Sequence, residues 1–197
     1  VNIVAGTNEK QNLLRYIEQY GEEGTQIHIR PYEELGDYED DGILISTSSR
    51  TRAYIKIEEG CDRFCAYCII PYARGPVRSR NKNAILTEAR ELVNRGFKEI
   101  VLTGINTALY DDLPGLLDEL DAMEGNFRVR LSSLEPTVID RDFIEKIIKS
   151  KRLCHHLHLS LQSGSNKVLK EMNRNYSRET YLSITETLRE FDPLYAI

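Results

Sequence analysis

The sequence predicts an α/β fold in which repeated strand–helix units form a parallel sheet that curls into a partial, open barrel. Three observations predict it. From residue 53 onward, short apolar strands alternate with amphipathic helices, the pattern of a parallel sheet with crossover helices. The strand expected at 155–161 has one polar face, which suits a barrel lumen better than a sheet covered on both faces. Four such units and the start of a fifth strand at 194–197 cannot close a barrel, so we expect an unpaired edge.

The first 21 residues predict a small unit that precedes the barrel. VNIVAG predicts a short strand, and the residues after it predict a helix that ends at Gly21. Four apolar side chains share one face of this helix: Leu13, Leu14, Ile17 and Tyr20. The pattern is that of the last strand–helix unit of a larger α/β domain.

Residues 22–52 predict a linker. The segment joins an acidic stretch to the polar run STSSRTR and shows no helical period. We expect one short strand in it, at 43–45.

Residues 53–197 carry the strand and helix patterns of the barrel. The clearest helix has apolar side chains at a 3.6-residue period: Leu113, Leu116, Leu117, Leu120 and Met123. Ser165 and Ser177 precede two later helices as candidate N-caps. Strands are expected at 53–57, 99–104, 127–133 and 155–161, and helices at 86–95, 113–123, 141–149, 165–172 and 178–190.

The third and fourth strands alternate apolar and polar side chains. In the fourth strand the leucines face one way, and the polar side chains face the other: His156, His158, Ser160 and Gln162. In the third strand the polar face carries Arg128, Arg130 and Ser132. These faces predict a polar lumen that receives a ligand, with an edge strand that has one wet face as the alternative.

The composition excludes several classes of protein. Among 197 residues, 41% are apolar, and 26 basic side chains stand against 31 acidic ones, so general disorder is excluded. No apolar run approaches the roughly 20 residues that span a bilayer, and the N-terminus lacks the features of a secretory signal. The net charge of −5 argues against a nucleic-acid partner unless the charge is unevenly distributed.

The positive charge does concentrate in one segment, 63–82. It contains no acidic residue and five basic ones: Arg63, Arg74, Arg78, Arg80 and Lys82. Such a segment is either a solvated loop or a surface that contacts nucleic acid.

Three of the four cysteines lie within the same region. Cys61, Cys65 and Cys68 have the spacing C-x3-C-x2-C, directly after the first barrel strand, where barrel enzymes carry their active sites. Such crowding in a cysteine-poor chain predicts metal binding in a reducing compartment, which we take to be the cytoplasm. Three thiolates can hold three irons of a 4Fe–4S cluster and leave the fourth iron open to a ligand. The alternative is zinc or a closed electron-transfer centre, although zinc ordinarily needs a fourth ligand.

The remaining cysteine and three histidines have structural interpretations. We expect Cys154 to pack against a helix as a small apolar residue. His155, His156 and His158 are more simply explained as polar side chains of the lumen than as metal ligands.

The segment GCDRFCAYCIIPYARG, with Tyr67 before the last cysteine, resembles the radical S-adenosylmethionine (SAM) superfamily. This resemblance implies that Cys61, Cys65 and Cys68 bind a 4Fe–4S cluster. The amino and carboxylate groups of SAM would chelate its open iron, and one electron would cleave SAM to methionine and a 5′-deoxyadenosyl radical. No catalytic side chain is assigned, because the cofactor carries the chemistry.

Five longer segments resemble one branch of that superfamily, the tRNA and ribosomal-protein methylthiotransferases. They are residues 59–80, 102–106, 132–136, 156–174 and 178–182. Within the branch, GPVRSR, LTGIN and SSLEP are most similar to enzymes that act on threonylcarbamoyladenosine in tRNA. The resemblance implies methylthiolation of carbon 2 of that adenine, next to the anticodon, with tRNA, SAM and a reductant as partners and no membrane.

Alternatives remain open at this point. The substrate could instead be isopentenyladenosine in tRNA or a ribosomal protein. An alternative of another class is a non-enzymatic iron–sulfur or zinc module that binds RNA through its basic segment.

The resemblance also implies a domain organisation. Residues 1–21 would end an N-terminal methylthiotransferase domain, 22–52 would be a linker, and 53–197 would form the radical SAM barrel. In this branch the N-terminal domain holds a second 4Fe–4S cluster through three further cysteines, but no cysteine precedes Cys61 here. We therefore expect a fragment that is inactive by itself.

The resemblance assigns further side chains to SAM. Tyr67 would pack near the adenosine, Gly104 and Asn106 would lie by the methionyl amino group, and Arg174 would pair with the carboxylate. The ribose or carboxylate contacts would be Ser160, Gln162 and Ser163. The rim of the site, where phosphates of an anticodon loop could bind, would carry Arg74, Arg78 and Arg80.

Overall fold

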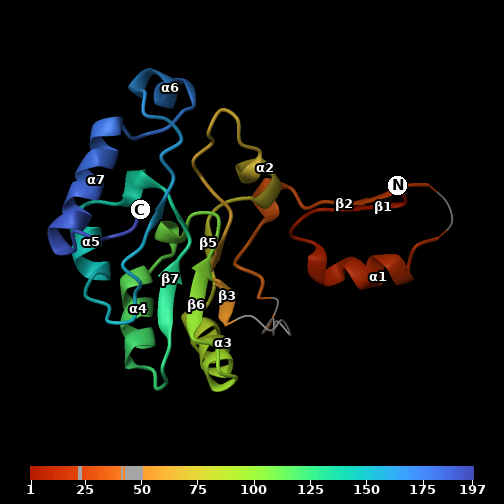
Figure 1. Cartoon of the computed structure of the whole chain (residues 1–197). Coiled ribbons are helices and arrows are strands. Elements are labelled where there is room, and N and C mark those ends of the chain that lie inside the picture. Colours follow the sequence, from red (N-terminus) through yellow and green to blue (C-terminus); the bar gives the residue numbers. More distant parts are fainter. Residues whose placement is uncertain (22–23, 41, 43–50) are drawn as a thin grey trace.

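The computed structural model describes residues 1–21, 24–40, 42 and 51–197. At its centre lies a parallel three-stranded sheet in the order β3–β6–β7 (Figure 1). β3 spans Arg52–Lys56, β6 spans Glu99–Thr103 and β7 spans Arg128–Leu131. Helices α3 (Lys82–Asn94) and α4 (Leu113–Ala122) connect these strands, as the alternating sequence pattern predicts.

The parallel pairing continues in shorter pieces beyond β7. β8 (Ser133–Leu134) pairs with β9 (His158–Leu159), and single bridges join Val129 to Leu153 and His156 to Ala196. The expected strand 155–161 is therefore only two residues long as regular structure. It is short because its backbone divides its hydrogen bonds between two neighbours, Leu157 with Ala196 and Ser160 with Leu134.

The remaining elements surround the sheet. They are α2 (Ile70–Arg74), α5 (Arg141–Ile147), α6 (Asn166–Glu171), α7 (Arg178–Phe191) and the antiparallel pair β4 (Glu58–Glu59) and β5 (Arg78–Ser79). Short 3-10 helices occupy Lys10–Asn12, Tyr32–Glu34, Thr107–Leu109 and Pro136–Val138. Among the described residues, no helix has the length and apolar character needed to cross a bilayer.

One face of the sheet forms the apolar core. Ile55, Leu102 and Leu131 stand side by side on adjacent strands, and all three are fully buried. They belong to one cluster with the buried faces of α3 and α4: Ile85, Ala89, Leu92, Leu113, Leu116, Leu117 and Leu120. The 3.6-residue period of helix 113–123 thus identified its buried face.

The opposite face is more polar and more open. Tyr54 on β3 is 51% exposed, while its neighbours Ala53 and Ile55 are buried. On the fourth strand Leu157 and Leu159 are buried and His158 is exposed, as alternation predicts. The alternation ends there, because Leu161 is 39% exposed and Gln162 adopts a left-handed φ of 56°.

Cys154 lies on this inner face, not against a helix as we expected. Leu153 takes the core position, and strand alternation turns Cys154 to the other side. The environment of its thiol is polar: Arg130, Glu99, Arg128 and Arg52 act on it electrostatically. His155 also leaves the lumen, because its Nδ1 lies 2.6 Å from the Asp192 carboxylate at the surface.

Caps explain where the helices begin. α3 begins at Lys82, four residues earlier than expected, because the Asn81 side chain accepts hydrogen bonds from the amides of residues 83 and 84. Ser177 caps α7, as predicted, and its side chain also forms a capping box with Thr180. The Ser165 side chain, in contrast, makes no capping hydrogen bond to α6.

The N-terminal unit contains β1 (Ile3–Ala5), α1 (Leu13–Glu18) and β2 (Gln26–His28), and β1 pairs with β2 in parallel (Figure 1). The sequence analysis missed β2, which lies in the segment taken as a linker. The strand expected at 43–45 lies outside the described residues. The unit contacts α2 of the barrel, where the Thr7 hydroxyl donates to the Ala73 carbonyl at 2.6 Å.

Glu99 joins the three central strands at their amino ends. It is 4% exposed, and its carboxylate accepts from Arg128 Nε at 2.5 Å and from Arg130 Nε at 2.9 Å. Arg52 Nε on β3 lies 2.9 Å from the same group. Hydrogen bonds from Arg130 and Arg128 lower the pKa of Glu99 to about 2, although burial opposes them.

We expect Glu99→Gln to lower the free energy of unfolding by about 1–3 kcal/mol at pH 7, because three guanidinium groups lose their shared anion. The folded pKa of about 2 lies below the ordinary value of 4.5, so this stabilisation is complete above pH 4.5 and is lost as the pH falls toward 2. Urea unfolding of both proteins at pH 7 and pH 3 measures the difference. A difference that stays constant with pH would contradict this account.

Candidate functional site

The cysteine loop, residues 60–69, connects β4 to α2 at the carboxyl end of the central strands. It begins at Gly60, which has a φ of +87°. A Cβ atom there would lie 1.8 Å from the Pro76 carbonyl oxygen, so only glycine permits this approach. The amide of Cys61 donates to the Gly75 carbonyl at 3.1 Å and closes the base of the loop.

The loop holds three thiols in one neighbourhood. Cys61 and Cys65 are buried, Cys68 is partly exposed, and the Cys68 amide donates to the Cys65 carbonyl at 2.9 Å. Burial raises the pKa of the Cys61 and Cys65 thiols, and neighbouring thiols raise it further. A positive metal centre would reverse that shift, because thiolates are the ligand form.

Three thiols are the donor set of a 4Fe–4S cluster that keeps one iron open. In the part of the chain that the structure describes, no three His, Cys, Asp or Glu side chains are placed to hold one metal ion. A zinc site would gather its ligands around one point, whereas in a cluster each thiolate binds a different iron. Cys61, Cys65 and Cys68 are thus the residues that could hold a 4Fe–4S cluster.

A segment about 100 residues further along the chain holds the loop in place. The Ala66 amide donates to the Met172 carbonyl at 3.0 Å, and Asn173 Nδ2 donates to the Phe64 carbonyl at 2.9 Å. Phe64 and Asn173 both have left-handed φ values, 45° and 57°; asparagine adopts this conformation readily, whereas an aromatic residue does so rarely. The loop is therefore fixed by tertiary contacts and not by its own secondary structure.

Tyr67 and Arg174, two residues assigned to SAM from the sequence, meet in this segment. Arg174 Nη2 donates to the Tyr67 hydroxyl at 2.6 Å, and the guanidinium carbon lies 5.8 Å from the Tyr67 ring centroid. Arg174 also acts electrostatically on the Cys65 thiol, which places its charge near the cysteines.

Gly104 and Asn106 meet at the end of β6, around Glu58. The Glu58 side chain is fully buried, and its Oε1 accepts a hydrogen bond from the backbone amide of Asn106 at 2.6 Å. A Cβ at Gly104 would lie 2.4 Å from the same oxygen, so the glycine makes room for the carboxylate. Burial raises the pKa of Glu58 to about 7. The sequence analysis missed Glu58, although its alternation with Tyr54 and Lys56 places it on the polar inner face.

Glu135, the acidic residue of SSLEP, completes the centre of the site. It is 6% exposed and lies between Arg63 Nε at 3.7 Å and Arg174 Nη1 at 3.9 Å. Its amide donates to Asn106 Oδ1 at 3.1 Å, so the ends of β6 and β8 are joined. The sequence analysis noted the SSLEP segment for its resemblance to a family but did not identify Glu135 as a site residue.

Several buried polar atoms in this site make no hydrogen bond. Among the described residues these are Glu58 Oε2, Asn106 Nδ2, Arg63 Nε and Arg174 Nε. A buried polar atom without a partner costs about 1–3 kcal/mol, so a concentration of such atoms indicates a polar ligand. One free acceptor and several free donors suit a ligand that carries both a cationic and an anionic group.

Ser160 lies beside the strand that leads to Glu135, because its backbone amide donates to the Leu134 carbonyl at 3.0 Å. The Ser160 carbonyl accepts from the buried Tyr176 hydroxyl at 2.6 Å, and Ser163 Oγ accepts from the Ser165 amide at 3.1 Å. In the described residues, no hydrogen bond joins the side chains of Ser160, Gln162 and Ser163 to the cysteine loop. Their expected contacts to ribose or carboxylate stay predictions.

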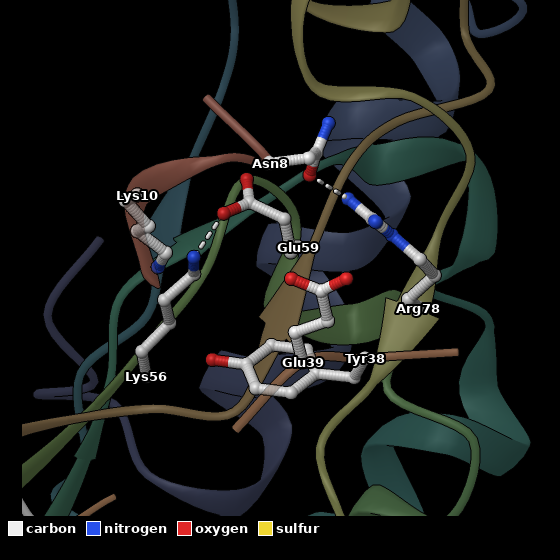
Figure 2. A pocket seen from close by; sticks show the side chains of 7 residues that line it. All are labelled: Asn8, Lys10, Tyr38, Glu39, Lys56, Glu59 and Arg78. Carbon is white, nitrogen blue, oxygen red and sulfur yellow. Dashed lines mark hydrogen bonds and ion pairs between the residues drawn. The ribbon is translucent and has the colours of Figure 1, made fainter. Parts of the chain in front are cut away.

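The three arginines assigned to the rim occupy different environments. Arg74 lies 3.3 Å from both oxygens of Glu59. Arg78 Nη2 donates to Asn8 Oδ1 at 3.0 Å across a small pocket, where Lys56 approaches Glu59 (Figure 2). Two of the three arginines thus contact acidic or polar side chains at the junction with the N-terminal unit.

Arg80 does not lie on a rim. It is 5% exposed, and its guanidinium is paired with Glu88 on α3 and with Asp40 at 2.9 Å. A further guanidinium donor is directed at the carbonyl of Lys56 at 3.5 Å. The guanidinium donors of Arg80 are engaged inside the protein and cannot bind a phosphate. The expectation that Arg80 lies on the RNA-binding rim is therefore wrong.

Comparison with protein families decides the superfamily. The model described as "Radical SAM superfamily" matches residues 55–192, which is most of the chain. The chain belongs to the Radical SAM superfamily. A solved radical SAM methyltransferase, TsrM from Kitasatospora setae, has the same fold, with a TM-score of 0.60 and 19% identity over 71% of this chain and 28% of that one.

This radical SAM chain is also similar to curated tRNA-modifying enzymes. It is 41% identical to the threonylcarbamoyladenosine tRNA methylthiotransferase MtaB of Bacillus subtilis (strain 168), over 100% of this chain and 45% of that protein. It is 38% identical to the tRNA-2-methylthio-N(6)-dimethylallyladenosine synthase of Clostridium perfringens (strain SM101 / Type A), over 98% of this chain and 44% of that protein. The expected resemblance to methylthiotransferases is confirmed, and the chain spans about half the length of these relatives.

We expect Gly60→Ala to destabilise this radical SAM domain by about 3 kcal/mol or more, because it adds a backbone clash to a left-handed φ. Two matched variants separate these effects. Gly96 has a φ of +92° but open space around an added Cβ, so Gly96→Ala should cost about 1–2 kcal/mol. Gly164 has neither a left-handed φ nor a close neighbour, so Gly164→Ala should cost under about 0.5 kcal/mol. Urea unfolding measures all three. Equal losses for Gly60 and Gly96 would refute the role of the close approach.

Proposed function

We propose that this chain is the radical SAM part of a tRNA methylthiotransferase, with a 4Fe–4S cluster bound by Cys61, Cys65 and Cys68 and with SAM beside it. The observation that carries the proposal is the loop that holds three thiols together, with the charges of Arg174 and Glu135 acting on Cys65. The methylthiotransferase relatives support the same conclusion.

The side chains around the loop suit the charged end of SAM. Arg174 and Arg63 lie beside Glu135, each has an Nε without a hydrogen-bond partner, and a guanidinium is the preferred partner of a carboxylate. Arg174 also orients Tyr67, whose half-exposed ring offers a surface for the adenosine. Gly104 and Asn106 lie at the end of the neighbouring strand, where the amino group would be held.

The cluster and SAM would bring the reactive chemistry. When bound, the cluster supplies the electron that cleaves the sulfonium of SAM. The chain's own residues bind and orient: the thiols are shielded by burial of Cys61 and Cys65, and contacts to residues 172–174 keep the loop in one position.

We further propose that the substrate is threonylcarbamoyladenosine in tRNA, modified at carbon 2 of the adenine. The 41% identity to the Bacillus subtilis enzyme and the GPVRSR, LTGIN and SSLEP segments support this choice. Isopentenyladenosine is the second candidate, because relatives named for the dimethylallyl product are 38% identical. Either substrate would place the protein in the cytoplasm.

Contacts to RNA would come from the exposed part of the cysteine-loop region. Arg74 and Arg78 remain candidates for phosphate contacts. Phe64 and Tyr72 are exposed and form an edge-to-face pair with ring centroids 5.5 Å apart, which offers an aromatic surface beside these charges.

Electron paramagnetic resonance of the anaerobically reconstituted, reduced protein tests the cofactor proposal. We expect one 4Fe–4S signal that changes when SAM is added, because an open iron can take an external ligand. Alanine variants of Cys61, Cys65 and Cys68 should each lose the signal.

Cys154→Ala is the matched control, since Cys154 lies on the inner face among arginines. It should keep both the signal and the response to SAM. A cluster that ignores SAM, or bound zinc without a cluster, would instead favour a non-enzymatic RNA-binding module.

The substrate proposal is tested with a protein of the relatives' full length that contains this chain. We expect methylthiolation of tRNA that carries the threonylcarbamoyl group and none of the same tRNA without it, measured by mass spectrometry of the released nucleosides. Activity on unmodified or isopentenylated tRNA would refute the specific substrate.

A further inference from the structure

An exposed pair of aromatic side chains lies beside the three thiols. Phe64 directly precedes Cys65, and Tyr72 lies on α2, which follows the cysteine loop. Tyr72 is 69% exposed, more than any other tyrosine or phenylalanine of the described residues, and Phe64 is 41% exposed. Large apolar side chains that stay in water next to a candidate site indicate a surface that binds a partner.

Folding of the loop does not by itself explain an aromatic residue at position 64. The Phe64 carbonyl accepts a hydrogen bond from Asn173 Nδ2 at 2.9 Å, and φ is 45°, a conformation that aromatic residues adopt rarely. Glycine or asparagine would take this conformation more easily. The ring is also not needed for the core, because it is exposed. We therefore attribute its presence to binding.

The two rings form a corner. Their centroids lie 5.5 Å apart, and their planes meet at 76°. In an edge-to-face pair one ring presents its edge to the face of the other, so part of the ring surface remains free for a third flat group. A planar ligand can stack on one ring while it contacts the edge of the other.

Positively charged side chains flank the pair. The segment 63–82 contains five basic residues and no acidic one, and Arg63 and Arg74 stand on either side of the pair in the sequence. Arg74 shares the Glu59 carboxylate with Lys56, so one positive charge remains in excess there. Aromatic faces beside cations bind single-stranded nucleic acid, because the bases stack and the phosphates meet positive charge.

We propose that Phe64 and Tyr72 stack an unpaired base of the tRNA anticodon loop, beside the adenosine that is modified. This inference rests on the proposed function and names the part of the tRNA that this surface binds. The stacked base is not the target, because the target must reach the surroundings of the buried Cys61 and Cys65, whereas both rings lie at the surface. By holding a neighbouring base, the pair keeps the target unstacked at the site.

Binding of anticodon stem–loop RNA to a reconstituted protein of the relatives' full length that contains this chain tests the assignment. We expect Tyr72→Leu to weaken binding about 10-fold, measured by fluorescence anisotropy, because it removes the stacking surface and keeps an apolar side chain. Tyr72→Phe keeps the ring and should bind within about 2-fold of the wild type. The Tyr72 side chain is exposed on α2, outside the cysteine loop, so we expect both variants to fold.

Stem–loops that lack one base each identify the stacked nucleotide. An abasic site at one position next to the target should weaken binding to the wild-type protein about 10-fold. With Tyr72→Leu the same abasic RNA should lose less than about 2-fold, because the stacking contact is already absent. A residue that only supports the structure does not produce this coupling between one side chain and one base.

Three further measurements separate stacking from other effects. Ile69 is 68% exposed in the same loop but has no ring, so Ile69→Ala should change RNA binding by less than about 2-fold. The slope of affinity against salt concentration should be the same for Tyr72→Leu and the wild type, because a stacked base releases no counterion. The change of the cluster signal with SAM checks that the loop is intact in each variant.

The outcomes distinguish this assignment from the proposed function. If the wild-type protein binds the RNA and Tyr72→Leu binds it equally, or if no abasic position couples to Tyr72, the assignment alone is wrong. Equal losses for Tyr72→Leu and Ile69→Ala would also overturn it, because any apolar contact would then suffice. A wild-type protein that binds a ribosomal-protein peptide and no tRNA would overturn the proposed function together with the assignment.

Discussion

Two hydrogen bonds between side chains and backbone amides join the ends of β4, β6 and β8, and the arrangement of the site depends on them. Glu58 Oε1 accepts a hydrogen bond from the backbone amide of Asn106, and Asn106 Oδ1 accepts one from the backbone amide of Glu135. The parallel register brings these three strand ends to the same edge of the sheet, which no local sequence feature could achieve. Because each link uses a backbone amide, the ends of β4, β6 and β8 are fixed relative to one another before any ligand binds.

Periodicity and spacing predicted the parts of the structure that local physics controls. The apolar face of α4, the N-cap at Ser177 and the position of the cysteine loop after the first barrel strand all follow from short stretches of sequence. β2 was missed because a three-residue strand leaves almost no periodic signal, and β9 is shorter than expected because its hydrogen bonds are divided between two neighbours. Cys154 was expected against a helix because free cysteines are usually buried. The alternation of side chains along the strand instead turns it to the face opposite Leu153.

Charged residues were the hardest to interpret from the sequence. The basic segment 63–82 suggested an exposed surface, yet Arg80 is buried against Glu88 and Asp40. Its partners lie 8 and 40 residues away, so only the folded chain reveals the pairing. Glu58 illustrates the converse: it lies close to the cysteines in sequence, but its complete burial is visible only in three dimensions.

The attachment of the cysteine loop to residues 172–174 has a consequence for biosynthesis. The hydrogen bonds that hold the loop span 107 and 109 residues of sequence. During translation the three cysteines leave the ribosome well before the segment that fixes them, and at about 5–20 residues per second the delay is several seconds or more. In that interval the contacts that fix the loop cannot form. We therefore expect cluster insertion into the completed domain and not into the nascent chain.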